Sequence, residues 1–322
     1  MALRVLVLPS LPGVADPDRS RIAVLPAGSR RDLASAVEAG GGVLSEPGDA
    51  VALVWTEVAD AGGLGRVLEE HPGLGWVQLP WAGVEPYVDV IRTHAERTWT
   101  CGKGVYAEPV AEHALALALA GRRGLDHYAR ATAWSAQRGH NLLGGRVTIV
   151  GGGGIAESLL RLLGPFRCDV TVVRRTPRPM AGAAQVVGDE QLDDALTGAD
   201  VVVLALPLLP STAGLIDRRR LGLLAPGGCL VNVARGQLVV TGDLVDALRD
   251  GTLGSAGLDV TDPEPLPEGH PLWSLPNAIV TPHTANTQEM AIPLLGARIR
   301  DNVRRWIGGE PLAGLVDPIA GY

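Results

Sequence analysis

The stretch RVTIVGGGGIAESLLRLLGPF, residues 146–166, constrains the fold more than any other part of the sequence. A strand pattern of apolar residues is followed by four glycines and then by a helix pattern with one apolar face. The residues from Gly151 to Ala156 fit G-x-G-x-x-G/A, in which the first glycine permits a tight turn and the second lets a ligand approach the backbone. The small Ala156 lets the helix pack closely on the strand. Such a strand–turn–helix unit is typical of a doubly wound parallel sheet.

The glycine turn also predicts a site for an anionic ligand. The helix that begins at the turn offers N–H donors and the positive end of its dipole. We expect Gly151, Gly153, Gly154 and Ile155 to bind the pyrophosphate of a dinucleotide. A merely flexible turn is the alternative, and the strand–turn–helix context disfavours it. Because Gly152 and Gly154 replace the bulkier residues usual inside such turns, we expect a slightly looser turn.

The segment TVVRRTPRP, residues 171–179, bears on which dinucleotide is bound. In NAD-binding domains an acidic residue about 20 positions beyond the glycines accepts hydrogen bonds from the ribose hydroxyls. Here Arg174 stands in that place, followed by Arg175 and Thr176. A guanidinium cannot accept such a bond, but it pairs well with a phosphate. We therefore favour NADP(H), with these three residues at its additional phosphate. The alternative is NAD(H), with the arginines in a solvated loop.

The rest of the chain repeats the alternation of strand and helix patterns, which predicts an α/β fold. Before the glycine turn, the buried strands are expected at LRVLVLP, RIAVLP, VALVWT and GWVQLP. After it, they are expected at CDVTVV, DVVVLALP, GCLVNVA, AGLDV and NAIVTPH. We predict two doubly wound parallel-sheet domains, a flavodoxin-like substrate domain and a Rossmann dinucleotide-binding domain.

The expected domain boundaries follow from the position of the glycine turn. Because the dinucleotide signature begins only at residue 151, a first domain must precede it. The amphipathic helix MAIPLLGARIRDNVRRWIGGE near the end of the sequence is expected to return to that first domain. We predict a discontinuous substrate-binding domain of residues 1–103 and 289–322 and a dinucleotide-binding domain of residues 104–288.

Composition argues against several classes of function. A formal charge of −7 and a pI near 5.5 disfavour a nucleic-acid surface, which needs a basic patch. The sequence has no apolar run of about 18 residues and no signal-peptide pattern, so we expect a cytoplasmic protein without a membrane partner. Cys101, Cys168 and Cys229 form no C-x-x-C pair, which predicts reduced thiols and no metal site. Lys103 is the only lysine, which excludes the short-chain and β-hydroxyacid dehydrogenases because they need a catalytic lysine elsewhere.

Polar residues follow the ends of several predicted strands, where ligands bind in a doubly wound sheet. They are the loop Pro207–Thr212, Arg235, Asp259 with Glu264, and His283. A guanidinium can hold a carboxylate and polarise a carbonyl. A histidine can exchange a proton with a hydroxyl, and a carboxylate beside it would orient the ring. The set predicts hydride transfer between a nicotinamide and a 2-oxo or 2-hydroxy acid, although each residue alone also fits a turn cap or a surface side chain.

The motifs VTIVGGGGIA, LPLLPSTAGLI, LVNVARGQLV, AGLDVTDPEPLPEGHPLW and VTPHTA together resemble those of the D-isomer-specific 2-hydroxyacid dehydrogenase family. The resemblance runs through most of residues 75–285 and implies an NAD(P)-dependent enzyme. It implies that Arg235 binds the substrate carboxylate, that His283 is the acid/base and that Glu264 is its partner. The further cofactor contacts that it implies are Pro207, Thr212, Ala234 and Asp259, the last of these near the nicotinamide carboxamide.

The resemblance also extends to the first domain. Within LPWAGVE, Ala82 and Gly83 match a loop whose backbone amides bind the substrate carboxylate, and a tight turn into the next helix is the alternative. Trp81 fits either a cover over a small apolar group of the substrate or an exposed hinge residue. The missing acid after the second strand, EPLPEGHPLW and the ending VDPIAGY are similar to the glyoxylate/hydroxypyruvate reductases of the family.

Two further expectations concern the oligomeric state of the protein and an alternative function. Family members are commonly dimers, and the predicted apolar helix from Pro109 to Arg122 is our candidate for the interface of a homodimer. Glu112 and His113, near the start of that helix, are expected to pack at a helix end or an interface and to take no part in the chemistry. The competing function is a nucleotide-sensing corepressor, which would keep the Arg–Glu–His set but act by binding other proteins.

Overall fold

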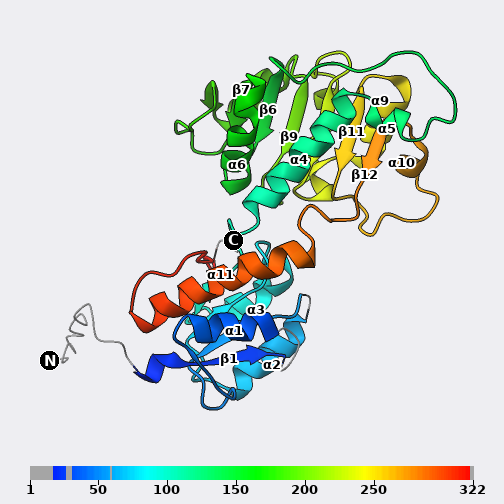
Figure 1. The fold of residues 1–322 in the computed structure, drawn as a ribbon. Coiled ribbons are helices and arrows are strands. Elements are labelled where there is room, and N and C mark those ends of the chain that lie inside the picture. Colours follow the sequence, from blue (N-terminus) through cyan, green and yellow to red (C-terminus); the bar gives the residue numbers. More distant parts are fainter. Residues whose placement is uncertain (1–16, 27–30, 59, 320–322) are drawn as a thin grey trace. The chain divides into compact units, whose positions relative to one another are not determined.

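The computed structural model describes residues 17–26, 31–58 and 60–319. The chain divides into two compact units, one of Met1–Tyr106 with Gln288–Tyr322 and the other of Ala107–Thr287. Each unit contains a parallel sheet covered by helices (Figure 1). The predicted strand LRVLVLP lies outside the described residues. No helix within the described ranges is long and apolar enough to cross a membrane.

The sheet of the first unit has five described strands, all parallel, in the order β2-β1-β3-β4-β5. This is the 2-1-3-4-5 order of flavodoxin-like folds. The two strands that the pattern did not predict, β2 and β5, are only two and three residues long. The strands are β1 Arg21–Leu25, β2 Val43–Leu44, β3 Ala52–Trp55, β4 Trp76–Gln78 and β5 Thr98–Thr100.

Helices cover both faces of this sheet because successive residues of a buried strand point to opposite sides. In β3, Ala52 and Val54 pack with one set of helices, α1 and α11. Leu53 and Trp55 pack with the other set, α2 and α3. The helix α11 therefore returns the end of the chain to the first unit. The helices are α1 Arg31–Ala39, α2 Ala61–Glu70, α3 Val88–Thr93 and α11 Gln288–Ile307, with short 3₁₀ helices η1 Pro17–Ser20 and η2 Glu85–Tyr87.

The sheet of the second unit has seven parallel strands in the order β12-β11-β10-β9-β6-β7-β8. Counted from the first strand of the unit, this is the 3-2-1-4-5-6 order of the Rossmann fold with a seventh strand at one edge. The three-residue β8 was not predicted. The strands are β6 Arg146–Val150, β7 Asp169–Val173, β8 Gln185–Val187, β9 Val201–Leu204, β10 Cys229–Asn232, β11 Ser255–Leu258 and β12 Ala278–Val280.

One face of this sheet packs against α4 and α6, and the other face packs against α7, α8 and α9. The helix α4 lies close to the sheet because glycines face it. A Cβ atom at Gly257 of β11 would lie 2.7 Å from Cβ of Leu117 on α4. The helices are α4 Ala107–Arg122, α5 Leu125–Tyr128, α6 Gly154–Leu163, α7 Leu192–Leu196, α8 Arg218–Leu221, α9 Thr241–Asp250 and α10 Pro271–Ser274, with 3₁₀ helices η3 Gly164–Phe166, η4 Asp189–Gln191 and η5 Gly236–Leu238.

Candidate active site

The glycine turn lies at the carboxyl end of β6 and leads into α6. Gly151 has φ +113°, and a Cβ atom there would overlap the carbonyl group of Ala205. A side chain is therefore excluded at this position by both conformation and space. The space beside Gly153 is open, with no atom within 4 Å of a Cβ placed there.

The backbone amides of this turn are available to a ligand. Those of Gly152, Gly153 and Gly154 donate no hydrogen bond to the described residues. Because the amides at a helix N-terminus have no partner within the helix, they suit an anion. Ile155 follows in the first turn of α6, and the buried Ala156 packs against the sheet. The geometry fits the predicted pyrophosphate site.

Arg174, the first residue after β7, lies against the glycine turn. A Cβ atom at Gly152 would lie 2.8 Å from Cδ and 3.1 Å from Nε of Arg174. The Nη1 atom of this guanidinium is buried and has no hydrogen-bond partner among the described residues. A buried donor without a partner is uncommon in proteins, so this one is a candidate contact for a bound ligand. Arg175 and Thr176 are exposed beside it. These three residues fit a phosphate next to the dinucleotide turn.

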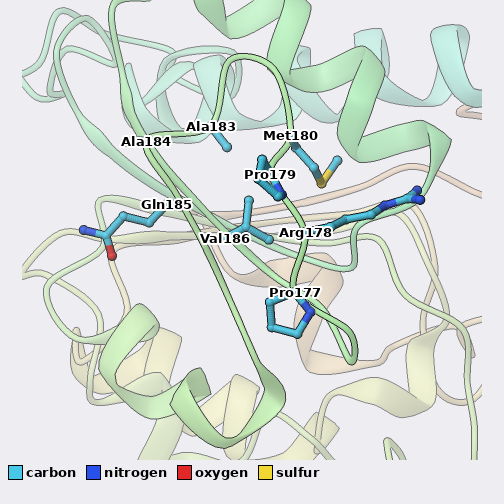
Figure 2. A pocket seen from close by; sticks show the side chains of 8 residues that line it. All are labelled: Pro177, Arg178, Pro179, Met180, Ala183, Ala184, Gln185 and Val186. Carbon is cyan, nitrogen blue, oxygen red and sulfur yellow. The ribbon is translucent and has the colours of Figure 1, made fainter.

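A pocket of about 310 Å³ follows along the same segment between β7 and β8 (Figure 2). Its lining is mostly apolar, with Arg178 as the one charged residue among the eight. None of the predicted cofactor residues lines it. Because its lining lacks the convergent polar groups of a ligand site, we do not assign the cofactor to it. The lining residues are Pro177, Arg178, Pro179, Met180, Ala183, Ala184, Gln185 and Val186.

Two further predicted cofactor contacts lie in the loop that follows β9. The hydroxyl group of Thr212 accepts a hydrogen bond from the Leu209 amide at 2.7 Å and donates to the Pro207 carbonyl at 3.0 Å. The loop is thus closed on itself, with Pro207 exposed. It begins beside the glycine turn, since Gly151 lies against Ala205.

His283 and Glu264 are brought together, although 19 residues separate them in sequence. The Nδ1 atom of His283 lies 2.7 Å from Oε1 of Glu264. The Nε2 atom makes no hydrogen bond with the described residues, so it is the nitrogen left to face a substrate. His283 has φ +53°, a conformation that is strained for residues other than glycine and that gathers at functional sites.

Arg235 follows β10, and its position depends on a close approach between two loops. A Cβ atom at the next residue, Gly236, would overlap the carbonyl group of Thr261. The Thr261 amide in turn donates to Oε2 of Glu264 at 3.4 Å. The Arg235 guanidinium donates from Nη1 to the carbonyl of the buried Ala234 at 2.7 Å. The loop of Arg235 therefore lies against the loop that carries Glu264.

Asp259, which follows β11, is only 2% exposed. Its carboxylate accepts hydrogen bonds from the Thr281 hydroxyl at 2.6 Å and from the amides of Thr284 and Ala285. Burial acts to raise the pKa of Asp259, but the hydrogen bonds that the carboxylate accepts outweigh it, and the pKa lies below its ordinary value. The carboxylate is therefore ionised and holds the segment next to His283.

One neighbour of this carboxylate was missed by the sequence reasoning. The Nε2 atom of His113 on α4 lies 2.9 Å from the Thr281 hydroxyl and 3.4 Å from Oδ1 of Asp259. His113 does pack near the start of its helix, as expected, but it does so against a predicted site residue. Glu112 is exposed. No local pattern signals the contact, because 168 residues separate His113 from Thr281.

In the first unit, the predicted substrate loop follows β4. Its amides at Ala82 and Gly83 donate no hydrogen bond to the described residues, which leaves them available to a carboxylate. Two hydrogen bonds hold the loop in place. The Gly102 amide donates to the Trp81 carbonyl at 2.8 Å. The Tyr106 hydroxyl donates to the Pro80 carbonyl at 2.5 Å. The rings of Trp81 and Tyr106 are in contact, with centroids 5.5 Å apart.

Comparison with known proteins connects these features to a family. The pattern described as the NAD binding domain of D-isomer specific 2-hydroxyacid dehydrogenases matches residues 113–285. An uncharacterized protein of Corynebacterium melassecola is 39% identical over 253 residues, which cover 77% of this chain and 83% of that protein. Glyoxylate/hydroxypyruvate reductase A of Serratia proteamaculans is 34% identical over 222 residues, which cover 67% of this chain and 69% of that protein.

A solved structure extends the similarity to nearly the whole chain. It is a D-isomer specific 2-hydroxyacid dehydrogenase from Xanthobacter autotrophicus Py2 in complex with NADPH and MES. Its TM-score is 0.79 at 28% identity, and the match covers 94% of this chain and 100% of that one. Both sheets therefore have counterparts in a known dehydrogenase.

The chain belongs to the D-isomer specific 2-hydroxyacid dehydrogenase family. It is an NAD(P)-dependent oxidoreductase, a class whose substrates are small 2-hydroxy or 2-oxo acids. The family, the fold class and the enzyme class predicted from the sequence are thereby confirmed. The roles of individual residues stay predictions.

Proposed function

We propose that the protein reduces glyoxylate, hydroxypyruvate or a similarly small 2-oxo acid to the D-2-hydroxy acid, with NADPH as the preferred cofactor. The observation that carries the proposal is the pair of His283 and Glu264 at 2.7 Å, beside the loop of Arg235. The similarity to glyoxylate/hydroxypyruvate reductase A of Serratia proteamaculans supports the choice of substrate.

The chain's own residues supply binding and proton transfer. The Arg235 guanidinium binds the substrate carboxylate and polarises the adjacent carbonyl. His283 delivers a proton from Nε2 to the carbonyl oxygen, while Glu264 accepts the hydrogen bond from Nδ1 and stabilises the imidazolium. When bound, a nicotinamide cofactor would supply a hydride for the carbonyl carbon. The Ala82 and Gly83 amides remain predicted contacts of the carboxylate.

The preference for NADPH rests on Arg174. The Arg174 side chain lies beside the glycine turn, and its buried Nη1 atom has no hydrogen-bond partner among the described residues, which fits a phosphate oxygen as acceptor. The exposed Arg175 and Thr176 would complete the phosphate contacts. The relative from Xanthobacter autotrophicus Py2 was solved with NADPH. These observations support the choice of cofactor.

Initial rates test the proposal. With glyoxylate and hydroxypyruvate as substrates and both cofactors at equal subsaturating concentrations, NADPH is expected to give the higher rate. Arg174→Ala is expected to raise KM for NADPH about 10- to 150-fold, because a hydrogen bond to a charged group contributes about 1.5–3 kcal/mol. KM for NADH should change little.

Arg66→Ala on α2 is the matched control, since it removes the same charge from an exposed position in the other unit. An equal use of both cofactors by the wild-type protein would place the arginines in a solvated loop. Absence of turnover with any small 2-oxo acid would favour a binding protein that acts as a corepressor.

We further propose a homodimer, and the segment 129–141 supports it. Every residue of this segment is exposed, and Trp134 within it is fully exposed. Aromatic side chains, tryptophan among them, are enriched in protein–protein interfaces relative to the rest of the surface. The predicted interface helix, α4, remains a second candidate for the interface. A cytoplasmic location also stays a prediction, supported by the three free cysteines.

Trp134→Ala is expected to weaken the dimer about 30- to 1,000-fold, because a central tryptophan commonly contributes about 2–4 kcal/mol to an interface. Sedimentation velocity over a range of protein concentrations measures the change. Val43→Ala, an equally apolar exposed position in the first unit, should leave the dissociation constant unchanged. A monomeric wild-type protein would refute the proposed assembly.

A further inference from the structure

Three polar side chains from three different elements meet within the second unit. His113 lies on α4, Asp259 follows β11 and Thr281 follows β12. The Thr281 hydroxyl lies between the other two, 2.6 Å from Oδ1 of Asp259 and 2.9 Å from Nε2 of His113. The site as described above uses Asp259 for the cofactor but gives His113 and Thr281 no role.

The direction of these hydrogen bonds follows from the number of protons that each of the three groups can donate. The ionised carboxylate of Asp259 can only accept, so the single hydroxyl proton of Thr281 is donated to it. The Thr281 oxygen must then act as the acceptor toward His113. His113 therefore carries a proton on Nε2 and donates it toward Thr281 and Asp259. The distances and the ionised state of Asp259 together assign a proton to this ring nitrogen.

The same carboxylate determines the backbone around His283. Asp259 accepts from the amides of Thr284 at 2.9 Å and Ala285 at 3.1–3.2 Å. The His283 amide donates to the Asp259 carbonyl at 2.9 Å. These bonds hold the segment on both sides of a residue whose φ of +53° is intrinsically unfavourable. The orientation of the His283 ring toward Glu264 thus depends on where the Asp259 carboxylate is held.

We propose that His113 is a positioning residue, which holds Asp259 and Thr281 so that the segment 283–285 presents His283 in its reactive orientation. His113 does not touch the substrate in this proposal and acts only through the other two side chains. The proposal rests on the proposed reductase function for its kinetic consequence. Its structural consequence, the restraint of the segment 283–285, can be measured without any turnover.

The sharpest test compares His113→Gln with His113→Asn. Both amides are polar, but only the longer glutamine side chain places an N–H donor where Nε2 of histidine lies. His113→Asn is expected to lower kcat about 10- to 100-fold, by analogy with residues that orient metal-binding side chains through hydrogen bonds. KM for the 2-oxo acid should stay within about threefold, because Arg235 is untouched. His113→Gln should retain most of the wild-type kcat.

Hydrogen exchange provides the readout that is independent of activity. In His113→Asn the amides of Thr284 and Ala285 are expected to exchange roughly tenfold faster, since their acceptor is no longer held. Amides of β6 should be unaffected. Thr281→Val removes the hydroxyl group between Asp259 and His113 and leaves α4 unchanged. It is expected to speed the exchange of the same two amides. Glu112→Gln, at the exposed neighbouring position, is the matched control.

The outcomes separate this proposal from the proposed function. Equal kcat values and equal exchange rates in His113→Asn and His113→Gln would overturn the positioning role. Faster exchange of Thr284 and Ala285 in a protein that reduces no 2-oxo acid would support the positioning role and refute the proposed function. Faster exchange throughout the unit in His113→Asn would mean a general structural role and would also overturn the proposal.

Discussion

Replacing His283 with asparagine is expected to lower kcat for reduction of the 2-oxo acid by about 10²–10⁴-fold, the usual contribution of a positioned general acid. Asparagine is the suitable replacement because it tolerates the left-handed conformation that His283 adopts at φ +53°. It cannot deliver a proton as imidazolium does. The binding of NADPH, measured by fluorescence, should change little, since the glycine turn and Arg174 are unaltered.

A matched control makes this test specific. His71→Asn, at the end of α2 in the other unit, is the control for loss of a histidine as such. If His283→Asn retained a rate within about threefold of the wild type, His283 would not be the acid.

Replacing Arg235 with alanine is expected to lower kcat/KM for the 2-oxo acid about 30- to 5,000-fold, because loss of one partner of a hydrogen-bonded charge pair costs about 2–5 kcal/mol. Most of the loss should occur in KM, since the guanidinium binds the carboxylate of the substrate in both the ground state and the transition state. Part of the loss should appear in kcat, since the same group polarises the carbonyl.

Arg235→Lys distinguishes charge from geometry. A lysine keeps the charge but loses the planar pair of donors, so it is expected to restore only part of the substrate affinity. Arg249→Ala on α9 is the control, because this arginine is exposed and pairs only weakly with Asp246 at 3.7 Å. An unchanged KM for the 2-oxo acid in Arg235→Ala would assign carboxylate binding to other groups.

The β6 and β7 patterns of five residues each were predicted correctly, because a parallel strand buried on both faces is continuously apolar. Length alone does not separate the predicted strands from the others, since β4 and β12 were predicted with only three residues each. The strands β2, β5 and β8, which also have two or three residues, were not predicted. Their existence depends on pairing with a neighbouring strand.

The contacts within the candidate site also differ in whether the sequence predicted them. The pairing of Glu264 and His283 was predicted from the family motifs, and the 2.7 Å contact agrees with it. The contact of Gly236 with Thr261 and the contact of His113 with Asp259 were not predicted. Each of these contacts joins segments from different elements, so the spacing of residues along the chain does not predict it.

By itself, the sequence determined the α/β alternation, the glycine turn from Gly151 to Ala156, and the order of Arg235, Glu264 and His283. These depend on local properties: the period of apolar residues, the conformational freedom of glycine and the chemistry of side chains at strand ends. Only the tertiary structure decided that Arg174 lies against the turn and that His113 meets Asp259. The physical reason is that such contacts arise when strands pair side by side, as β6 and β7 do, or when a helix packs on the sheet, as α4 does at Gly257. Both join residues far apart in the chain.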